Sequence, residues 1–212
     1  MLLLDPVFVN HCIEHLAHRG RPVFGSEVHK FRLNPVQSEH HVRSFEELNS
    51  IALPPDYRNF LITIGDGGAG PYYGVFPLGK MDDGFELKSW KDGDGFIGDL
   101  SEPFHLKEPW NDLSARPSAK LIETDEKEYD RKLRESEEIY WNPKLMNGAI
   151  PICHMGCALR VWLIVSGDRA GHLWRDGRAD DSGLSPMFTQ DHKPATFSSW
   201  YLDWLRDPES LP

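Results

Sequence analysis

The hydrophobic positions of this chain repeat at helical spacing in several segments. Apolar residues at i, i+3, i+4 and i+7 fall on one side of a helix, and this pattern or a helix start signal occurs five times. Asp5 and Pro6 suit the N-cap and first position of the first segment, and Pro55 suits the first position of the third. Ser44, with Glu47 three residues later, forms a capping-box pattern that opens the second. The sequence therefore predicts helices over residues 6–18, 45–52, 55–64, 123–140 and 197–205.

The segment 123–140 differs from the other predicted helices because charged residues of both signs dominate it. Tyr129, Leu133 and Tyr140 fall near one stripe, and most other positions are polar. A helix with this pattern usually exposes most of its surface. We therefore expect an exposed helix that lies along the domain.

Short apolar runs bounded by Gly, Pro and Asp occur between the helical segments, as is typical of strands. The segment 81–118 is rich in Asp, Gly and Pro with isolated aromatic residues, which predicts irregular loops and short strands. Together these elements imply a single α+β domain over residues 1–212, with a mainly antiparallel sheet and helices packed around it. The main strands are predicted over residues 72–78, 150–152, 159–165 and 172–174.

The most informative turn follows the helix predicted over residues 55–64. Gly65 ends that helix, and the next three residues, Asp66, Gly67 and Gly68, can adopt positive φ. The apolar run GPYYGVFPL, residues 70–78, comes directly after them. The segment therefore predicts a helix that runs through a tight turn into a strand.

This helix-turn-strand segment is followed by two further blocks that carry a resemblance. The first holds IPI at 150–152, VWLIVSG at 161–167 and GHLW at 171–174, and the second is FSSWYLDWL at 197–205. In this order, over about residues 24–206, the blocks resemble the SUKH superfamily. That group includes a fungal cell-wall assembly regulator and many bacterial toxin-immunity proteins. Asp66 stands where the family often has Asn, and both residue types tolerate a left-handed backbone.

The resemblance implies a family core over about residues 24–206, with an acidic insertion over about residues 81–140. It also implies a non-catalytic protein-binding domain, most simply a cytoplasmic immunity protein that binds a toxin and neutralises it. The alternative is a regulatory or scaffold module with a housekeeping partner, as in the fungal members. An isolated gene away from any toxin gene favours that alternative.

The charge of the chain restricts the class of partner. The formal net charge is −10, and residues 81–138 hold 17 acidic and nine basic residues, a net charge of −8. Such a segment repels phosphate groups, so direct nucleic-acid binding is disfavoured, whereas a basic protein is attracted. A basic toxin domain such as a nuclease fits this balance. Acidic surfaces also occur in proteins simply because they keep the chain soluble.

The chain has the composition of a cytoplasmic protein. Its hydrophobic content of 40% over 212 residues suffices for a sizeable core, and no apolar run approaches the roughly 20 residues of a membrane span. The apolar start is interrupted by Asp5 and Pro6, so we expect no signal peptide. An odd number of cysteines, at positions 12, 153 and 157, fits a reducing compartment.

One pattern could carry enzymatic chemistry. His11, Glu14 and His15 match H-x-x-E-H, in which two helical histidines bind zinc and the glutamate acts as a base. His11, His15 and His18 cluster opposite the apolar stripe of the same helix, so they are expected to face solvent, whereas catalytic zinc needs a third ligand and a sheltered cavity. A zinc hydrolase is therefore only a remote alternative, and we expect no metal, no cofactor and no catalytic residues.

Two weaker patterns predict no site. Cys153 and Cys157 are separated by three residues, and no second pair completes a tetrahedral metal site. The run that begins at Asp92 starts like a calcium loop, but Phe96 and Ile97 stand where that loop needs an acidic residue and a glycine. We therefore read these segments as an inert cysteine pair and a turn.

The glycine turn, the tyrosines after it and the following acidic loop form the predicted partner-binding rim. Tyr72 and Tyr73 can equally be ordinary strand residues, and that alternative stays open. The residues predicted to contact a partner are Asp66, Gly67, Tyr72, Tyr73, Trp90, Asp92 and Asp94.

Overall fold

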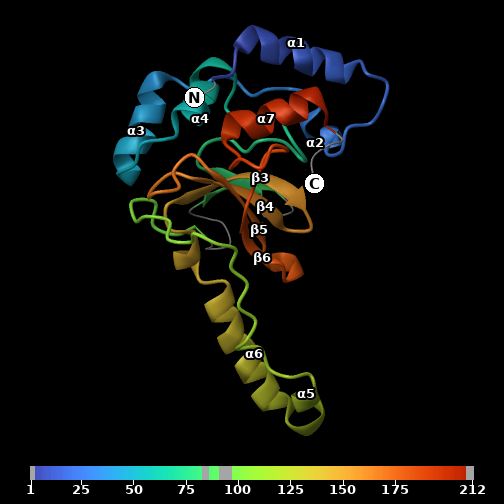
Figure 1. Cartoon of the computed structure of the whole chain (residues 1–212), viewed down its shortest axis with the longest axis vertical. Helices are drawn as coiled ribbons and strands as arrows, with labels where there is room; N and C mark the ends of the chain where they lie inside the picture. The colour runs from blue at the N-terminus through green and yellow to red at the C-terminus, as the bar shows by residue number, and fades with distance from the viewer. Residues whose placement is uncertain (1–2, 83–85, 91–96, 209–212) are drawn as a thin grey trace.

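A four-stranded antiparallel sheet lies at the centre of the molecule, with most of the helices on one side of it and two helices projecting on the opposite side (Figure 1). The computed structural model describes residues 3–82, 86–90 and 97–208. Each strand pairs with the next one along the chain, so the sheet is a meander. The α+β class expected from the sequence is confirmed. The strands are β3 (Ala149–Gly156), β4 (Leu159–Ile164), β5 (Leu173–Gly177) and β6 (Gly183–Pro186).

Both faces of this sheet are buried. Along β4, Val161 and Leu163 point into a core shared with the helices, whereas Trp162 and Ile164 point into a second core on the opposite face. Phe104 and other residues of the segment before α5 cover that second face. Because both faces are covered, the strand sequences are nearly continuous apolar runs and do not alternate between apolar and polar residues.

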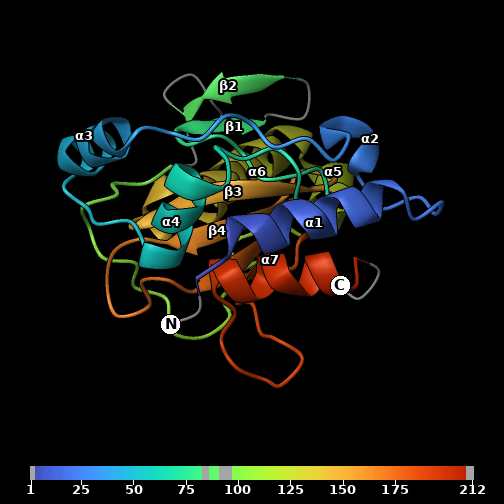
Figure 2. The same cartoon turned by 90° about the horizontal axis from the view of Figure 1, so that it is seen from above.

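Three helices form the layer over the first face. α7 (Phe197–Arg206) contacts both α1 (Pro6–Ala17) and α4 (Pro55–Thr63), and Figure 2 shows α1 and α7 side by side. Their apolar stripes are the ones that the sequence predicts, and they meet in an aromatic cluster in which Phe197 lies 4.9 Å from the rings of Tyr57 and Phe60. Burial of these large rings stabilises the layer.

A buried carboxylate joins α4 to the start of α7. Asp56 is 4% exposed, and its Oδ2 accepts a hydrogen bond from the backbone N–H of Ser198 at 3.0 Å. Ser198 lies in the first turn of α7, whose N–H groups have no partner within the helix. Asp56 therefore satisfies a helix terminus that lies far away in the sequence.

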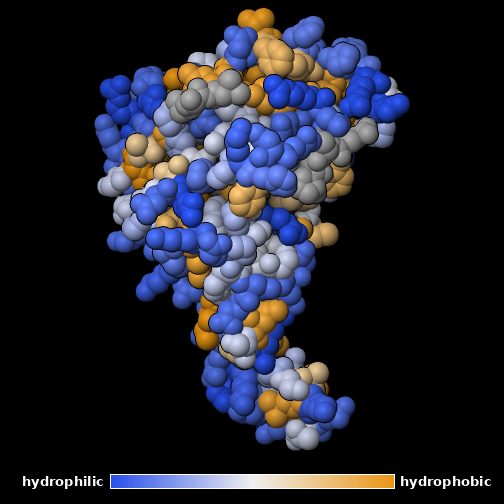
Figure 3. Space-filling view, in the orientation of Figure 1, coloured by the Kyte–Doolittle hydropathy of each residue, from blue (hydrophilic) through white to orange (hydrophobic). Residues whose placement is uncertain are grey.

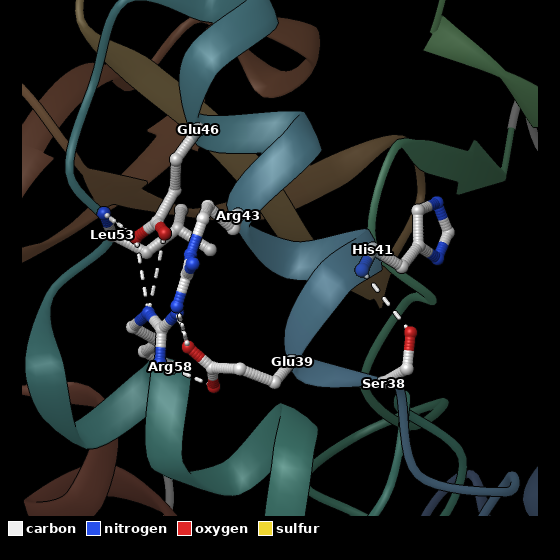
Figure 4. A network of polar contacts seen from close by, with 7 residues as sticks. All are labelled: Ser38, Glu39, His41, Arg43, Glu46, Leu53 and Arg58. Atoms are coloured by element: carbon white, nitrogen blue, oxygen red, sulfur yellow. Dashed lines mark hydrogen bonds and ion pairs between the residues drawn. The ribbon is translucent and has the colours of Figure 1, made fainter.

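The helix before α4 begins earlier than its predicted capping box. α3 runs from Glu39 to Asn49, and the hydroxyl of Ser38 accepts the N–H of His41 at 3.1 Å (Figure 4). Ser44 lies inside the helix, so the capping-box prediction is wrong.

Acidic side chains of α3 instead bind the next segment. Glu46 accepts the N–H of Leu53 at 2.9 Å, and the guanidinium of Arg58 on α4 contacts Glu46 at 3.2 Å and Glu39 at 2.6 Å (Figure 4). These contacts fix α3 against α4.

The turn after α4 has the predicted glycine conformations, but the expected strand does not follow it. Gly67 and Gly68 have φ values of +76° and +94°, and a Cβ on Gly67 would lie 2.4 Å from the carbonyl oxygen of Val75. In the segment 72–78 only Val75 forms β-bridges, to Gly68 and to Cys153 of β3. Positive φ at Tyr72, +52°, interrupts an extended backbone. The strand prediction is therefore wrong for most of this segment.

An arm made of α5 (Lys120–Thr124) and α6 (Glu126–Tyr140) projects from the body (Figure 1). The charged helix was predicted, but its expected position along the domain is wrong. Only Ser136 and Tyr140, near the end attached to the body, are buried. The rest of α6 is held by ion pairs within the helix, such as Arg131 with Glu128 at 2.6 Å. Figure 3 shows that the arm is mostly hydrophilic on the side in view.

A buried ion pair anchors the arm to the sheet. Arg178 contacts Asp176 at 2.7 Å, and their side chains are 0% and 4% exposed. The same guanidinium lies 4.8 Å from the ring of Trp141 and donates to the carbonyl oxygen of Tyr140 at 3.3 Å. The end of α6 is thereby tied to the end of β5.

Five further short elements lie within residues 3–82, 86–90 and 97–208, and several were not predicted. Two lie in the predicted loop region and form a small antiparallel hairpin. No helix among residues 3–82, 86–90 and 97–208 is long and apolar enough to cross a membrane. The five are α2 (Ser26–His29), β1 (Lys80–Asp82), β2 (Leu87–Ser89), η2 (Pro143–Met146) and η3 (Arg178–Asp180).

Candidate functional site

A large apolar groove lies between α7, the segment that precedes α2 and the end of the sheet. Its volume is about 970 Å³. Strand residues, helix residues and two loops contribute to it, so it is assembled from segments far apart in the sequence. We call it the apolar groove; its principal apolar residues are Phe24, Met155, Met187, Phe188, Trp200 and Trp204.

One rim of the apolar groove is formed by Phe24, whose position depends on Gly25. Gly25 has φ +78°, and a Cβ there would lie 1.9 Å from the carbonyl oxygen of Tyr72, so the backbone can approach only because this residue is glycine. Phe24 is 59% exposed, and its ring lies 6.5 Å from that of Tyr72 and 5.3 Å from that of Tyr73. Tyr73 in turn stacks on His154 of β3 at 5.5 Å. The exposed ring of Phe24 therefore packs against the rings of Tyr72 and Tyr73, which hold it in place.

The second rim is the hairpin that joins β6 to α7. Met187 and Ala195 pair through a backbone hydrogen bond of 2.9 Å, and Thr189 donates its N–H to the carbonyl oxygen of Lys193 at 2.9 Å. Phe188 lies on this hairpin and is 57% exposed. The hairpin thus holds a second large apolar side chain at the groove.

α7 supplies a wall that combines aromatic and acidic groups. Trp200 and Trp204 are almost fully buried, and Asp203 lies between them in sequence and lines the apolar groove. Partial burial raises the pKa of the Asp203 carboxyl, and the charge of Arg206 opposes that rise. Burial therefore disfavours the charged form of this carboxylate unless a cation approaches.

A buried histidine, His29, packs against Trp204 of α7. His29 of α2 is 8% exposed, and its ring meets Trp204 edge-on at 5.9 Å and Phe31 at 5.3 Å. Its Nδ1 accepts the N–H of Phe31 at 3.1 Å. Burial lowers the pKa of His29 to about 4, so the ring is neutral near pH 7.

Acid is expected to destabilise the protein through His29. Its pKa is about 4 in the folded state against 6.5 in an unfolded chain, so between these values the unfolded state binds more protons. The stabilising contribution is fully present above pH 6.5 and is lost as the pH falls towards 4. Between pH 7 and pH 5 we expect His29 to lower the free energy of unfolding by about 1–2 kcal/mol.

Urea denaturation at both pH values tests this expectation. The variant His29→Gln should lose less stability on acidification than the wild type, since glutamine does not titrate. His11→Gln, at an exposed position on α1, is the matched control and should behave like the wild type. Equal acid sensitivity of wild type and His29→Gln contradicts the assignment.

Two of the predicted partner-binding residues build the turn instead of a surface. Asp66 is 9% exposed, and its carboxylate accepts the N–H of Leu78 at 2.8 Å and the side-chain amide of Gln37 at 2.6 Å. Gly67 is packed against the backbone of Val75. Since both carboxylate oxygens of Asp66 bind the protein itself, its role in the structure is internal.

The other predicted residues are separated in space. Tyr72 is buried and lines the apolar groove, and Tyr73 packs beside it under Phe24. Trp90 does not line the groove; it packs on Phe45 of α3 at 5.6 Å and donates to the carbonyl oxygen of Lys80 at 2.7 Å. Asp92 and Asp94 lie outside the described residues.

The remote zinc hypothesis concerns the exposed face of α1. His11, Glu14 and His15 are all exposed there, as their helical spacing predicts. In the described ranges, no group of three or more His, Cys, Asp or Glu side chains could hold a metal ion. The three cysteines are free thiols, and burial raises the pKa of Cys153.

The apolar groove suits non-covalent recognition. It combines exposed aromatic rings, methionines that can adjust to a partner's shape, and one partly desolvated carboxylate. Sequence reasoning missed Phe24, Phe188 and Asp203, because no local signal distinguishes an exposed phenylalanine from a core one. Comparison of the chain with protein-family models, curated proteins and solved structures finds no match.

Proposed function

We propose that this chain is a non-catalytic protein-binding domain that neutralises a toxin by covering it. The sequence resemblance to the SUKH superfamily suggests this role, and the apolar groove supplies a surface for it. The observation that carries the proposal is the exposure of Phe24 and Phe188, 59% and 57%, at the rim of one groove. Large apolar side chains gathered at one place on a surface mark an interaction site.

The physical basis of inhibition is occlusion. Aromatic side chains give large contact areas at low cost in side-chain entropy, and methionines adjust to the shape of the partner. Met155 and Met187 lie in the groove with the aromatic residues. The net charge of −10 accelerates encounter with a basic partner, so the association rate should fall as salt is added.

A binding and inhibition assay tests the proposal. The product of a neighbouring toxin gene should be retained by the immobilised chain, and its activity should fall as the chain is added. Phe24→Ala and Phe188→Ala should each weaken this association on the order of tenfold to a hundredfold. Leu48→Ala is the control, because Leu48 is 76% exposed on α3 and does not line the groove.

Two results contradict the proposal. One is the absence of any association with an adjacent toxin at micromolar concentration. The other is association that neither phenylalanine variant weakens, which would assign the contact to another surface.

A further inference from the structure

We propose that the apolar groove receives a lysine or arginine side chain of the partner polypeptide, with Asp203 as its counter-charge. This inference rests on the proposed function and specifies the chemistry of the segment that the groove binds. The partner segment is apolar around one basic residue.

The apolar groove is lined by one acidic residue, Asp203, and one basic residue, Arg175, which differ in their partners. Asp203 makes no side-chain hydrogen bond or ion pair with any residue that the structure describes, although it lines the groove. Arg175, the basic residue of the lining, is already engaged: it contacts Asp180 at 3.3 Å and the hydroxyl of Ser182 at 3.3 Å. The positive charge of Arg175 is therefore balanced by Asp180, whereas the carboxylate of Asp203 has no close cationic partner among the described residues.

The charges that face Asp203 do not satisfy it. Arg206, one turn further along α7, is exposed and interacts with Asp203 only through space. Asp191 on the hairpin adds a repulsive contribution, but it is itself paired with Lys193 at 2.6 Å. The rise in the pKa of Asp203 is the expected sign of a carboxylate that lacks a close cationic partner.

The apolar lining of the groove fits the hydrocarbon stem of a basic side chain. Lysine and arginine have long hydrocarbon stems that bury against apolar surfaces while the charged end reaches a polar group. On α7, Trp200 lies three residues before Asp203 and Trp204 lies one residue after it, and Phe24 lies at the rim. Aromatic faces also attract cations directly. A basic side chain thus matches both the charge and the lining of the groove.

Charge also favours a different polypeptide over a second copy of this chain. Each of two copies carries a net charge of −10, so the two chains repel each other at long range, whereas a basic partner is attracted. Association of two copies through the groove remains a distinguishable outcome, because Phe188→Ala would then convert a dimer in solution to a monomer.

Two short peptides test the proposal without any toxin. One is acetyl-Phe-Arg-Leu-amide, and the other carries citrulline in place of arginine, which keeps the shape and removes the charge. NMR titration of the full chain follows the indole N–H signals of Trp200 and Trp204. We expect the arginine peptide to bind about fivefold to tenfold more tightly than the citrulline peptide.

Two variants assign the difference to one carboxylate. In Asp203→Asn the preference for arginine should disappear, and the fold should be retained because the carboxylate makes no hydrogen bond with the described residues. Asp191→Asn is the matched control on the neighbouring hairpin and should keep the preference.

Three results overturn the inference: equal affinity for the two peptides, a preference that survives in Asp203→Asn, or no shift of either tryptophan signal at millimolar peptide. A dimer that dissociates in Phe188→Ala also overturns it, since the groove would then hold a second copy. Because the peptides are not toxins, arginine preference without toxin inhibition would refute the proposed function alone.

Discussion

Replacing Asp176 by alanine is expected to lower the free energy of unfolding by about 3–5 kcal/mol. Asp176 binds Arg178 through two side-chain contacts, at 2.7 and 2.9 Å, and accepts the backbone N–H of Arg178 at 3.1 Å. Both side chains are almost completely buried. The variant would remove the carboxylate whose two oxygens this buried guanidinium contacts, and the end of α6 beside Trp141 would lose that support.

The chain contains a matched control for this effect. Asp191 and Lys193 have the same spacing in sequence and nearly the same contact distance, 2.6 Å, but their side chains are 61% and 77% exposed. Water screens an exposed pair, so Asp191→Ala should destabilise the protein far less than Asp176→Ala does. Urea denaturation measures both variants. Similar losses for the two would contradict the assignment of a stabilising role to burial of the Asp176 pair.

The second large effect is expected at Gly25. Alanine there would place a Cβ 1.9 Å from the carbonyl oxygen of Tyr72 at a φ of +78°. Backbone strain and the forced displacement together should cost about 2–5 kcal/mol, and Phe24 should move away from the tyrosines that support it. The variant should therefore lose both stability and affinity at the apolar groove.

Gly20→Ala separates the two causes. Gly20 has a similar φ of +69°, but nothing lies within 4 Å of the position of its Cβ. It should show only the strain of the left-handed conformation, about 1–2 kcal/mol. Thermal and urea denaturation of both variants give the comparison. A Gly25→Ala variant that is no less stable than Gly20→Ala would contradict the close approach to Tyr72.

Sequence patterns predicted the elements whose apolar residues are local and periodic. The helices at Pro6, Pro55 and Phe197 were found because each has a stripe that packs on one core. The strands β3, β4 and β5 were found because both sheet faces are buried. β6 was missed, since its four residues include a glycine and a proline and carry only one large apolar side chain, Leu184.

Other elements differ from their predictions because contacts between residues distant in the sequence determine them. Ser38 caps α3 with its hydroxyl, although Ser44 has the stronger local signature. The segment 72–78 has the composition of a strand, but Tyr72 and Gly74 adopt positive φ where the chain passes Gly25 and Gly68. Tertiary contacts therefore override the local preference.

The candidate site was predicted only in part for the same reason. Tyr72 lines the apolar groove and Tyr73 packs against Phe24, whereas the carboxylate of Asp66 binds Leu78 and Gln37 within the protein. Phe24 and Phe188 come from loops separated by more than half of the chain and meet only at the apolar groove. Such a surface becomes visible only when the fold is known.

Hydrogen exchange of the chain, measured with and without the neighbouring toxin, tests the central claim most directly. If the apolar groove is the contact surface, binding should slow exchange in residues 22–25 and 187–195 and in the backbone of α7. The projecting arm of α5 and α6 should exchange at the same rate in both samples. Protection confined to the arm or to α1, with the two rims of the groove unchanged, would contradict the account.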